Sequence, residues 1–365
     1  MKAQVTTRQT CLILIIVAIT AKLLFLPSLL IQEVGRDAYL FVLLTMLAKI
    51  SILFVFVYLT YKFPQDDFKK LLTRLFGKVF SRVVMFLYFA YFVIQTGVVF
   101  QSAYVYLFEN LYSGLAWYIY VFPLIFTMVY VCLKGLRPIA RLVEIFCPVI
   151  IVGVILSFFL GGVNADFTNV LPFMENNFFV NLGGISKYAL WFSDYLIYLV
   201  LFGNIKITKQ YGKKILYAAL FCAVLVSVCI LIFYCLFDYS AIFHKNAITD
   251  VMQVVPRNSD IGSLDWVVTL IWDASMVIYM CIMFFASVKT CQDTFSIKKD
   301  WINILIVIIL LGGIVFVSKF DVARIIRDVS GVFRYFYYAV SWALPIVMFI
   351  IALCKTKEVA REKLD

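Results

Sequence analysis

The stretch AITAKLLFLP, Ala18 to Pro27, places one lysine inside a long apolar run. If that run, residues 10–31, is a helix that rises 1.5 Å per residue, Lys22 is about 14 Å from the nearer end. A charge at such a depth in a bilayer costs roughly 2.5–3.5 kcal/mol on insertion scales, so it needs a partner or a water-filled cavity. Lys22 is therefore the first candidate for a functional residue.

The composition indicates a membrane protein. Hydrophobic residues make up 64% of the 365 residues and charged residues only 15%, whereas soluble domains average roughly 45–50% and 25%. Runs long enough to cross roughly 30 Å of hydrocarbon as helices occur ten times, without the alternation of barrel strands. We therefore expect an all-α polytopic membrane protein with ten transmembrane helices in a single domain, residues 1–365. The ten runs are 10–31, 38–60, 80–107, 115–133, 142–162, 186–204, 214–236, 264–287, 301–318 and 332–354.

Basic residues predict the orientation of these helices. With the N-terminus in the cytoplasm, the inner segments hold 22 lysines and arginines and the outer segments hold 8. The positive-inside rule then places both termini in the cytoplasm and His244 outside. This asymmetry, together with attraction to anionic lipid in the bilayer, explains the net charge of +11 without nucleic acid as a partner.

The residues argue against an enzyme or a metalloprotein. His244 is the only histidine, and the chain has no CxxC or HExxH motif, phosphate-binding glycine loop or nucleophile elbow. The nine cysteines lie outside the expected outer loops, so a disulfide framework is not expected. We predict no catalytic residue, no metal and no cofactor.

Four charged residues lie inside the expected spans: Lys22, Lys49, Asp194 and Asp273. Their signs balance, so structural ion pairs would explain all four. Lys22 and Asp194 instead favour function, because they lie near the middle of the first and sixth helices. For Lys49 a structural and a functional role stay open.

The polar residues suggest two groups of five helices, residues 1–165 and 166–365. The leading helix of each group carries a charge, and the third carries Gln95 and Gln101 in one group and Asp273 and Ser275 in the other. Transporters built from inverted repeats bind substrate near the membrane midplane, where helices are broken. Termini of half-helices there suit the charged ends of a zwitterion. We therefore expect helices 1 and 6 to be broken.

Short motifs in order along the chain resemble the B subunit of spore germinant receptors. These permease-like proteins are a branch of the amino acid–polyamine–organocation transporter superfamily. The motifs are Leu26-Pro27, Gly35-Arg36-Asp37-Ala38-Tyr39, Phe63-Pro64, Gly77-Lys78, Gly135-Leu136 through Arg141 and Glu144, Asn169-Val170-Leu171-Pro172, and Phe192-Ser193-Asp194.

The resemblance implies where the site lies. The family's usual Gly-Thr-Gly break falls on Thr20, Ala21 and Lys22, and Asp194 stands where the family usually has glutamate. Lys22 would bind a ligand carboxylate or occupy the place of a coupling sodium ion. As its resident partner we expect Asp273 in preference to Asp194, which would bind a ligand amine. The expected ligand-binding residues are Thr20, Ala21, Lys22, Gln95, Gln101, Ser193, Asp194, Asp273 and Ser275.

The resemblance also implies a function and partners. It implies a ligand-sensing subunit in the spore inner membrane that binds a small nutrient such as an amino acid. An A-type membrane subunit and a C-type lipoprotein subunit would be its partners. A proton- or sodium-coupled amino acid transporter and a structural subunit with a vestigial pocket are the alternatives.

Two segments outside the spans carry expectations of their own. The outer segment 161–186 is either a plain loop or, as the resemblance implies, a segment with a short helix that lies over the site and acts as a lid. The inner segment 62–82 places apolar residues at helical spacing beside lysines, which predicts an amphipathic helix at the membrane surface.

Overall fold

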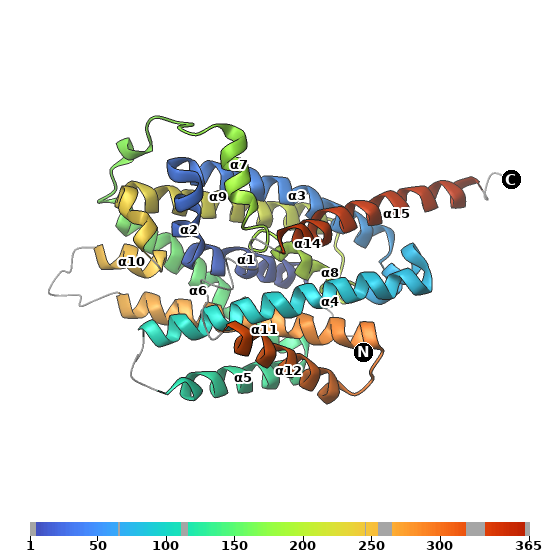
Figure 1. Ribbon diagram of the computed structural model, residues 1–365. Coiled ribbons are helices and arrows are strands. Elements are labelled where there is room, and N and C mark those ends of the chain that lie inside the picture. Colours follow the sequence, from blue (N-terminus) through green and yellow to red (C-terminus); the bar gives the residue numbers. More distant parts are fainter. Residues whose placement is uncertain are drawn as a thin grey trace.

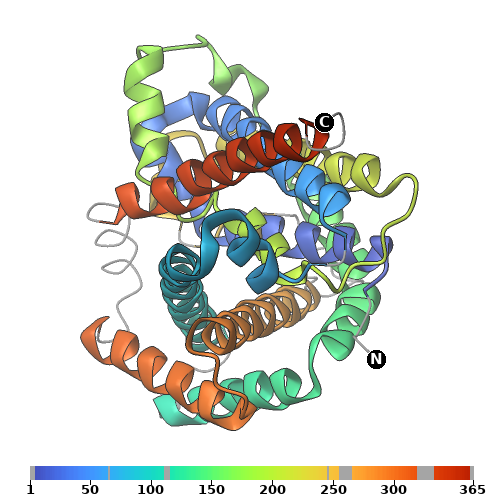
Figure 2. The same cartoon turned by 90° about the vertical axis from the view of Figure 1, so that its right-hand side faces the viewer.

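The protein is a bundle of long helices with no β-sheet in the described part of the chain (Figure 1). The computed structural model describes residues 5–64, 66–110, 116–244, 246–254, 265–318 and 333–361. Within these ranges the only β pairing is an isolated bridge between Val5 and Ile205. Seen end-on, the long helices α4 and α11 lie side by side near the middle of the bundle (Figure 2).

The elements follow the ten expected runs in order. They are α1 (Thr7–Leu24), α2 (Leu26–Val34), η1 (Gly35–Asp37), α3 (Ala38–Lys62), α4 (Phe68–Asn110), α5 (Trp117–Lys134), α6 (Leu136–Gly162), η2 (Phe167–Val170), α7 (Phe178–Ser186), η3 (Asp194–Leu196), α8 (Ile197–Leu201), α9 (Tyr211–Phe237), η4 (Asp238–Phe243), α10 (Ala247–Val254), α11 (Asp265–Phe295), α12 (Asp300–Ser318), α14 (Arg334–Tyr338), η5 (Ala339–Ala343) and α15 (Leu344–Arg361). The described residues contain nine helical segments long and apolar enough to span a membrane.

The sixth expected span is the one missing from these nine. Residues 186–204 do not form one helix: α7 ends at Ser186, turns follow to 193, and η3 and α8 are short. The expected break in helix 6 is therefore present, and it is longer than a kink. Such non-helical backbone is tolerated at membrane depth only where protein or a cavity surrounds it.

The first helix is also interrupted, but later than expected. Its break falls at Phe25, between α1 and α2, and not at Thr20, Ala21 and Lys22, which lie in the last turns of α1. Pro27 explains the position, because a proline is accepted in the first turn of a helix but not in its interior. Lys22 consequently projects from a regular helix close to its end.

The inner segment 62–82 differs from expectation in what it contacts. A short helix from Phe68 ends at Gly77, whose φ of +76° turns the chain into the long part of α4. Its apolar residues Phe68, Leu71, Leu72 and Leu75 are buried within the protein. The apolar face therefore packs on the bundle and is not available to lipid.

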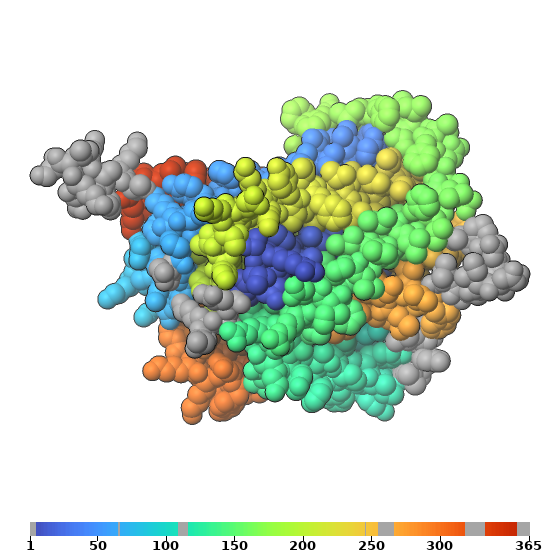
Figure 3. Space-filling view, turned by 180° about the vertical axis from the view of Figure 1, so that it is seen from behind, coloured from blue at the N-terminus to red at the C-terminus, as the bar shows by residue number. Residues whose placement is uncertain are grey.

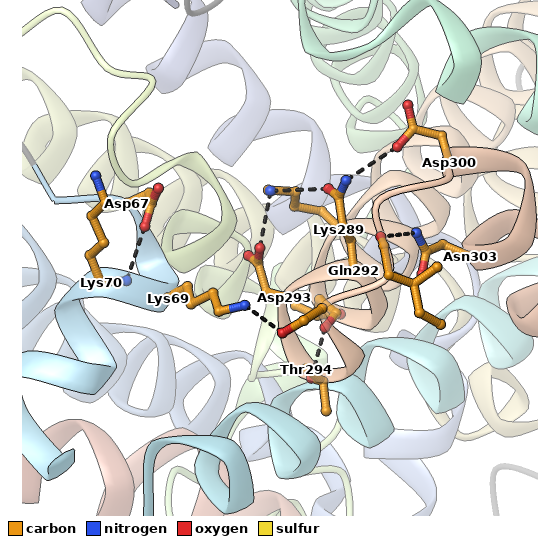
Figure 4. A network of polar contacts seen from close by, with 12 residues as sticks. Asp67, Lys69, Lys70, Lys289, Gln292, Asp293, Thr294, Asp300 and Asn303 are labelled. Atoms are coloured by element: carbon orange, nitrogen blue, oxygen red, sulfur yellow. Dashed lines mark hydrogen bonds and ion pairs between the residues drawn. The ribbon is translucent and has the colours of Figure 1, made fainter. Parts of the chain in front are cut away.

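The segments expected at the cytoplasmic face contact one another. Val5 pairs with Ile205, and Arg8 lies 3.6 Å from Glu144. Figure 4 shows a polar network that joins the start of α4 to the α11–α12 turn, in which Lys69 Nζ donates to Ser296 Oγ at 2.8 Å. Gln292 Nε2 also donates to Asp300 Oδ1 at 3.2 Å.

The outer surface of the bundle is rich in exposed apolar side chains, as a lipid-facing surface requires. Phe122, Phe126, Phe159 and Phe316 are each at least 64% exposed. From behind, the start of α1 is visible at the surface between α9 and α6 (Figure 3). The rest of α1 is buried, which places Lys22 inside the bundle.

Candidate functional site

A buried ion pair joins the two interrupted helices. Lys22 Nζ, from the last turn of α1, contacts Asp194 Oδ2, at the first residue of η3. The side chains are 3% and 4% exposed, respectively. Because both side chains are almost fully buried, each charge depends on the other, and the pair holds the break in helix 6 against the end of α1.

Two further side chains donate to the other oxygen of Asp194. Tyr279 Oη donates to Oδ1 at 2.9 Å, and Gln95 Nε2 lies 3.4 Å from the same atom. Gln95 Nε2 also donates to Tyr279 Oη at 2.9 Å. Tyr91, one turn before Gln95 on α4, donates to the carbonyl of Ser193 at 3.0 Å. Helices α1, α4 and α11 therefore all hold the start of η3.

This arrangement corrects the expected partner of Lys22. We expected Asp273 to pair with Lys22 and Asp194 to stay free for a ligand amine, but Asp194 is the resident partner. Asp273 is partly exposed, and its Oδ1 has no hydrogen-bond partner among the described residues.

The other expected ligand contacts divide into two groups. The hydroxyls of Thr20, Ser193 and Ser275 donate to carbonyls of their own segments, Ile16, Ala189 and Trp272. This bonding within their segments counts against a direct role of these hydroxyls in ligand binding. Ala21, Gln95 and Gln101 are fully or almost fully buried, and of these three Gln95 contacts Asp194.

A small cavity adjoins the ion pair. Its volume of about 10 Å³ is close to what one water molecule needs. Its lining residues are Lys22, Met46, Lys49, Phe192, Asp194 and Tyr195. The Tyr195 hydroxyl is buried and has no hydrogen-bond partner in the described part of the chain. The cavity therefore offers polar groups but no room for an amino acid in this conformation.

Sequence reasoning missed two tyrosines of this site. Tyr279 and Tyr91 are two of 22 tyrosines, and a tyrosine in an apolar helix is usually a packing residue. The spacing of Tyr91 four residues before Gln95 was a usable signal, because residues four apart share a helix face.

The outer segment is tied to the end of α2 and to η1. Arg36 Nε lies 2.8 Å from Glu175 Oε2, and Asp37 Oδ1 accepts from the amide of Met174 at 3.0 Å. Lys187 Nζ lies 2.6 Å from Glu33 Oε2. Nearby, hydrogen bonds from the hydroxyl and amide of Thr168 lower the pKa of Asp166. The expected short helix is present as α7, and a lid role stays a prediction.

Residues 4–322 match the family model described as "Spore germination protein". The chain belongs to the spore germination protein family. No functionally curated protein matches it in sequence. The match covers most of the chain, including both interrupted helices and all the residues around Asp194.

Solved structures show that this spore germination protein has a transporter fold. MhsT in complex with L-phenylalanine is 14% identical, with a TM-score of 0.64, over 94% of this chain and 97% of that one. A mutant of the manganese transporter from Eremococcus coleocola is 12% identical, with a TM-score of 0.58, over 96% and 85%. These transporters are built from inverted repeats, so the expected fold class is confirmed. Membership and fold together support a nutrient-sensing or transport membrane protein.

Proposed function

We propose that this protein is the ligand-sensing membrane subunit of a nutrient germinant receptor and that its ligand is a small amino acid. The carrying observation is the buried Lys22–Asp194 pair between the ends of two interrupted helices. An amino acid zwitterion presents the same two charges. Its carboxylate would replace Asp194 at Lys22, and its amine would replace Lys22 at Asp194.

Binding in this way requires the protein to change conformation. The cavity beside the pair has a volume of only about 10 Å³, so a ligand must move η3 away from α1. A ligand shifts such an equilibrium only by its difference in affinity for the two states. The two states differ in affinity here, because the conformation with the Lys22–Asp194 pair intact has no room for the ligand. Ligand binding would therefore move η3 relative to α1, and a receptor needs such a movement in order to signal.

The proposed partners follow from family membership. An A-type membrane subunit and a C-type lipoprotein would complete the receptor, in the spore inner membrane with both termini cytoplasmic. A proton- or sodium-coupled amino acid transporter is the second candidate, and the transporter fold favours it. In that function, the ammonium of Lys22 would stand where a coupling cation binds.

The test uses full-length protein in lipid nanodiscs and a panel of amino acids and nucleosides. We expect one or a few amino acids to raise the melting temperature, and Lys22→Met and Asp194→Asn each to abolish the effect. Lys187→Gln, which breaks a partly exposed ion pair, should keep it. Absence of stabilisation by every amino acid would contradict the proposal. Saturable uptake into proteoliposomes that depends on a proton or sodium gradient would favour the transporter.

A further inference from the structure

Lys49 is a buried charge without a resident counter-ion. Its side chain, in the middle of α3, is 5% exposed. Within the described ranges no carboxylate lies within ion-pair distance of it, and its Nζ donates to Ser341 Oγ at 2.8 Å. It also lies 4.5 Å from the ring centroid of Trp342. A hydroxyl and an aromatic ring stabilise an ammonium only partly.

The charged residues near Lys49 do not compensate its charge either. Lys22 and Lys49 line the small cavity beside Asp194, and that single carboxylate is already bound to Lys22. Asp273 does not pair with either lysine. With Lys49 protonated, the cluster carries one positive charge more than its single carboxylate compensates. Uncompensated charge in a low-dielectric site is costly, so an anion would be favoured next to Lys49.

Lys49 also lies at the base of a second and larger cavity. This cavity, about 190 Å³, lies between α3, α7 and the α14–η5 region. Buried Ile185 and Phe192 line its inner part, whereas Leu44, Leu182 and Tyr338 at its edge are at least 37% exposed. The cavity is therefore deep, mostly apolar, and accessible from the outer surface of the bundle.

The last helix is locally adapted to this cavity. Ser341 and Trp342, which both contact Lys49, lie in η5, a π-helical turn in an otherwise α-helical segment. Such single π turns occur often at functional sites, because they change which side chains face a neighbour. Here the turn brings a hydroxyl and an indole to one ammonium.

We propose that this cavity binds a small monocarboxylate with an apolar tail, whose carboxylate pairs with Lys49. An apolar cavity of about 150 Å³ holds benzene, so the volume here suits a tail of about six carbons. The tail would contact Trp342 and the apolar face of α7. Phe192 lines both cavities and is two residues before Asp194, so an occupant would also contact the break in helix 6.

The test uses full-length protein in detergent and the probe ω-bromohexanoate, whose bromine quenches nearby indoles. We expect saturable quenching of tryptophan fluorescence that Trp342→Phe removes. Lys49→Met should weaken binding about tenfold or more, as loss of a hydrogen bond to a charged group does, and Lys49→Arg should retain it. Ala48→Phe, which leaves the charge in place but fills the cavity, should also prevent binding.

Two controls make the outcome decisive. The uncharged ω-bromohexanol should not show saturable quenching; equal binding of the alcohol would overturn the proposal, because detergent-like partitioning would then explain it. Lys22→Met/Asp194→Asn, which removes both charges of the site proposed for an amino acid and leaves Lys49 without a counter-ion, should still bind the probe, which separates the two sites. Unchanged probe affinity in Lys49→Met would also overturn the proposal.

Discussion

Arg36 and Glu175 form an ion pair, Nε to Oε2 at 2.8 Å, that joins the end of α2 to the outer segment before α7. The pair links η1, which follows α2 of interrupted helix 1, to the segment before α7, which leads into interrupted helix 6. Arg36 also donates to the carbonyl of Leu171, so one side chain holds both ends of a loop. Movement of η1 relative to the outer segment would therefore break this contact.

Breaking this contact should loosen the outer segment with little loss of stability. The side chains of Arg36 and Glu175 are 13% and 45% exposed, and pairs with such exposure contribute roughly 0–1 kcal/mol. In Arg36→Gln we expect faster hydrogen exchange at residues 171–177. Lys187→Gln is the matched control, because its ion pair holds the far end of α7. Unchanged exchange at 171–177 would show that Arg36 does not restrain the segment.

The buried pair at the centre should behave differently. Lys22→Met leaves Asp194 without its counter-ion, and removal of one partner of a buried pair costs about 3–5 kcal/mol. The double variant Lys22→Met/Asp194→Asn should recover much of that loss. Chemical unfolding without ligand measures both.

Asp273→Asn supplies the control for this pairing. Since Asp273 does not contact Lys22, Asp273→Asn should not rescue Lys22→Met. Rescue by Asp273→Asn, with none by Asp194→Asn, would restore the pairing that the sequence suggested and refute the one described.

Tyr279→Phe tests the hydrogen bonds around Asp194. The substitution removes the donor at 2.9 Å and leaves the ring, so we expect a loss of about 1.5–3 kcal/mol, typical of a hydrogen bond to a charged group. Tyr91→Phe, which removes a 3.0 Å bond to a neutral carbonyl, should lose about 0.5–1.5 kcal/mol. The order of the two melting temperatures is the readout; the reverse order would argue that Asp194 does not depend on Tyr279.

The orientation in the membrane is testable by cysteine labelling. In a variant without its natural cysteines, His244→Cys should react with a membrane-impermeant maleimide from outside intact cells. Lys70→Cys should react only after the cells are opened. Both residues lie in loops or helix starts whose sides follow from the distribution of basic residues. Labelling with the opposite pattern would invert the topology.

Much of this fold could be predicted from the sequence, because apolar length and break-forming residues are local properties. In the described part of the chain, nine of the ten runs coincide with long helical segments, and the sixth run is broken, as expected. The partner of Lys22 could not be predicted in the same way. Depth along a helix follows from counting residues, but the direction of a side chain depends on rotation by about 100° per residue and on tilt. Asp273 lies at a depth that suits pairing with Lys22, but it does not contact Lys22.

The position of the first break shows a second limit. Thr20, Ala21 and Lys22 occupy the family's usual site of interruption, yet they stay helical and Phe25 takes the break. Without glycines there, the backbone has no low-cost route to other φ and ψ values. Pro27 is accepted only in the first turn of a helix, and the break at Phe25 places it there. Resemblance indicated the region, whereas local residue chemistry decided the position.

The Lys22–Asp194 pair also has an electrical consequence. The pair is neutral, and so is an amino acid zwitterion that takes its place between the two side chains. Transmembrane voltage acts on displaced net charge, at about 2.3 kcal/mol per elementary charge per 100 mV. Under the proposed function, a zwitterion that enters between the two side chains carries no net charge to the site, so its binding should depend little on membrane voltage. With that function, a receptor built this way would respond to the concentration of its nutrient without any supply of energy.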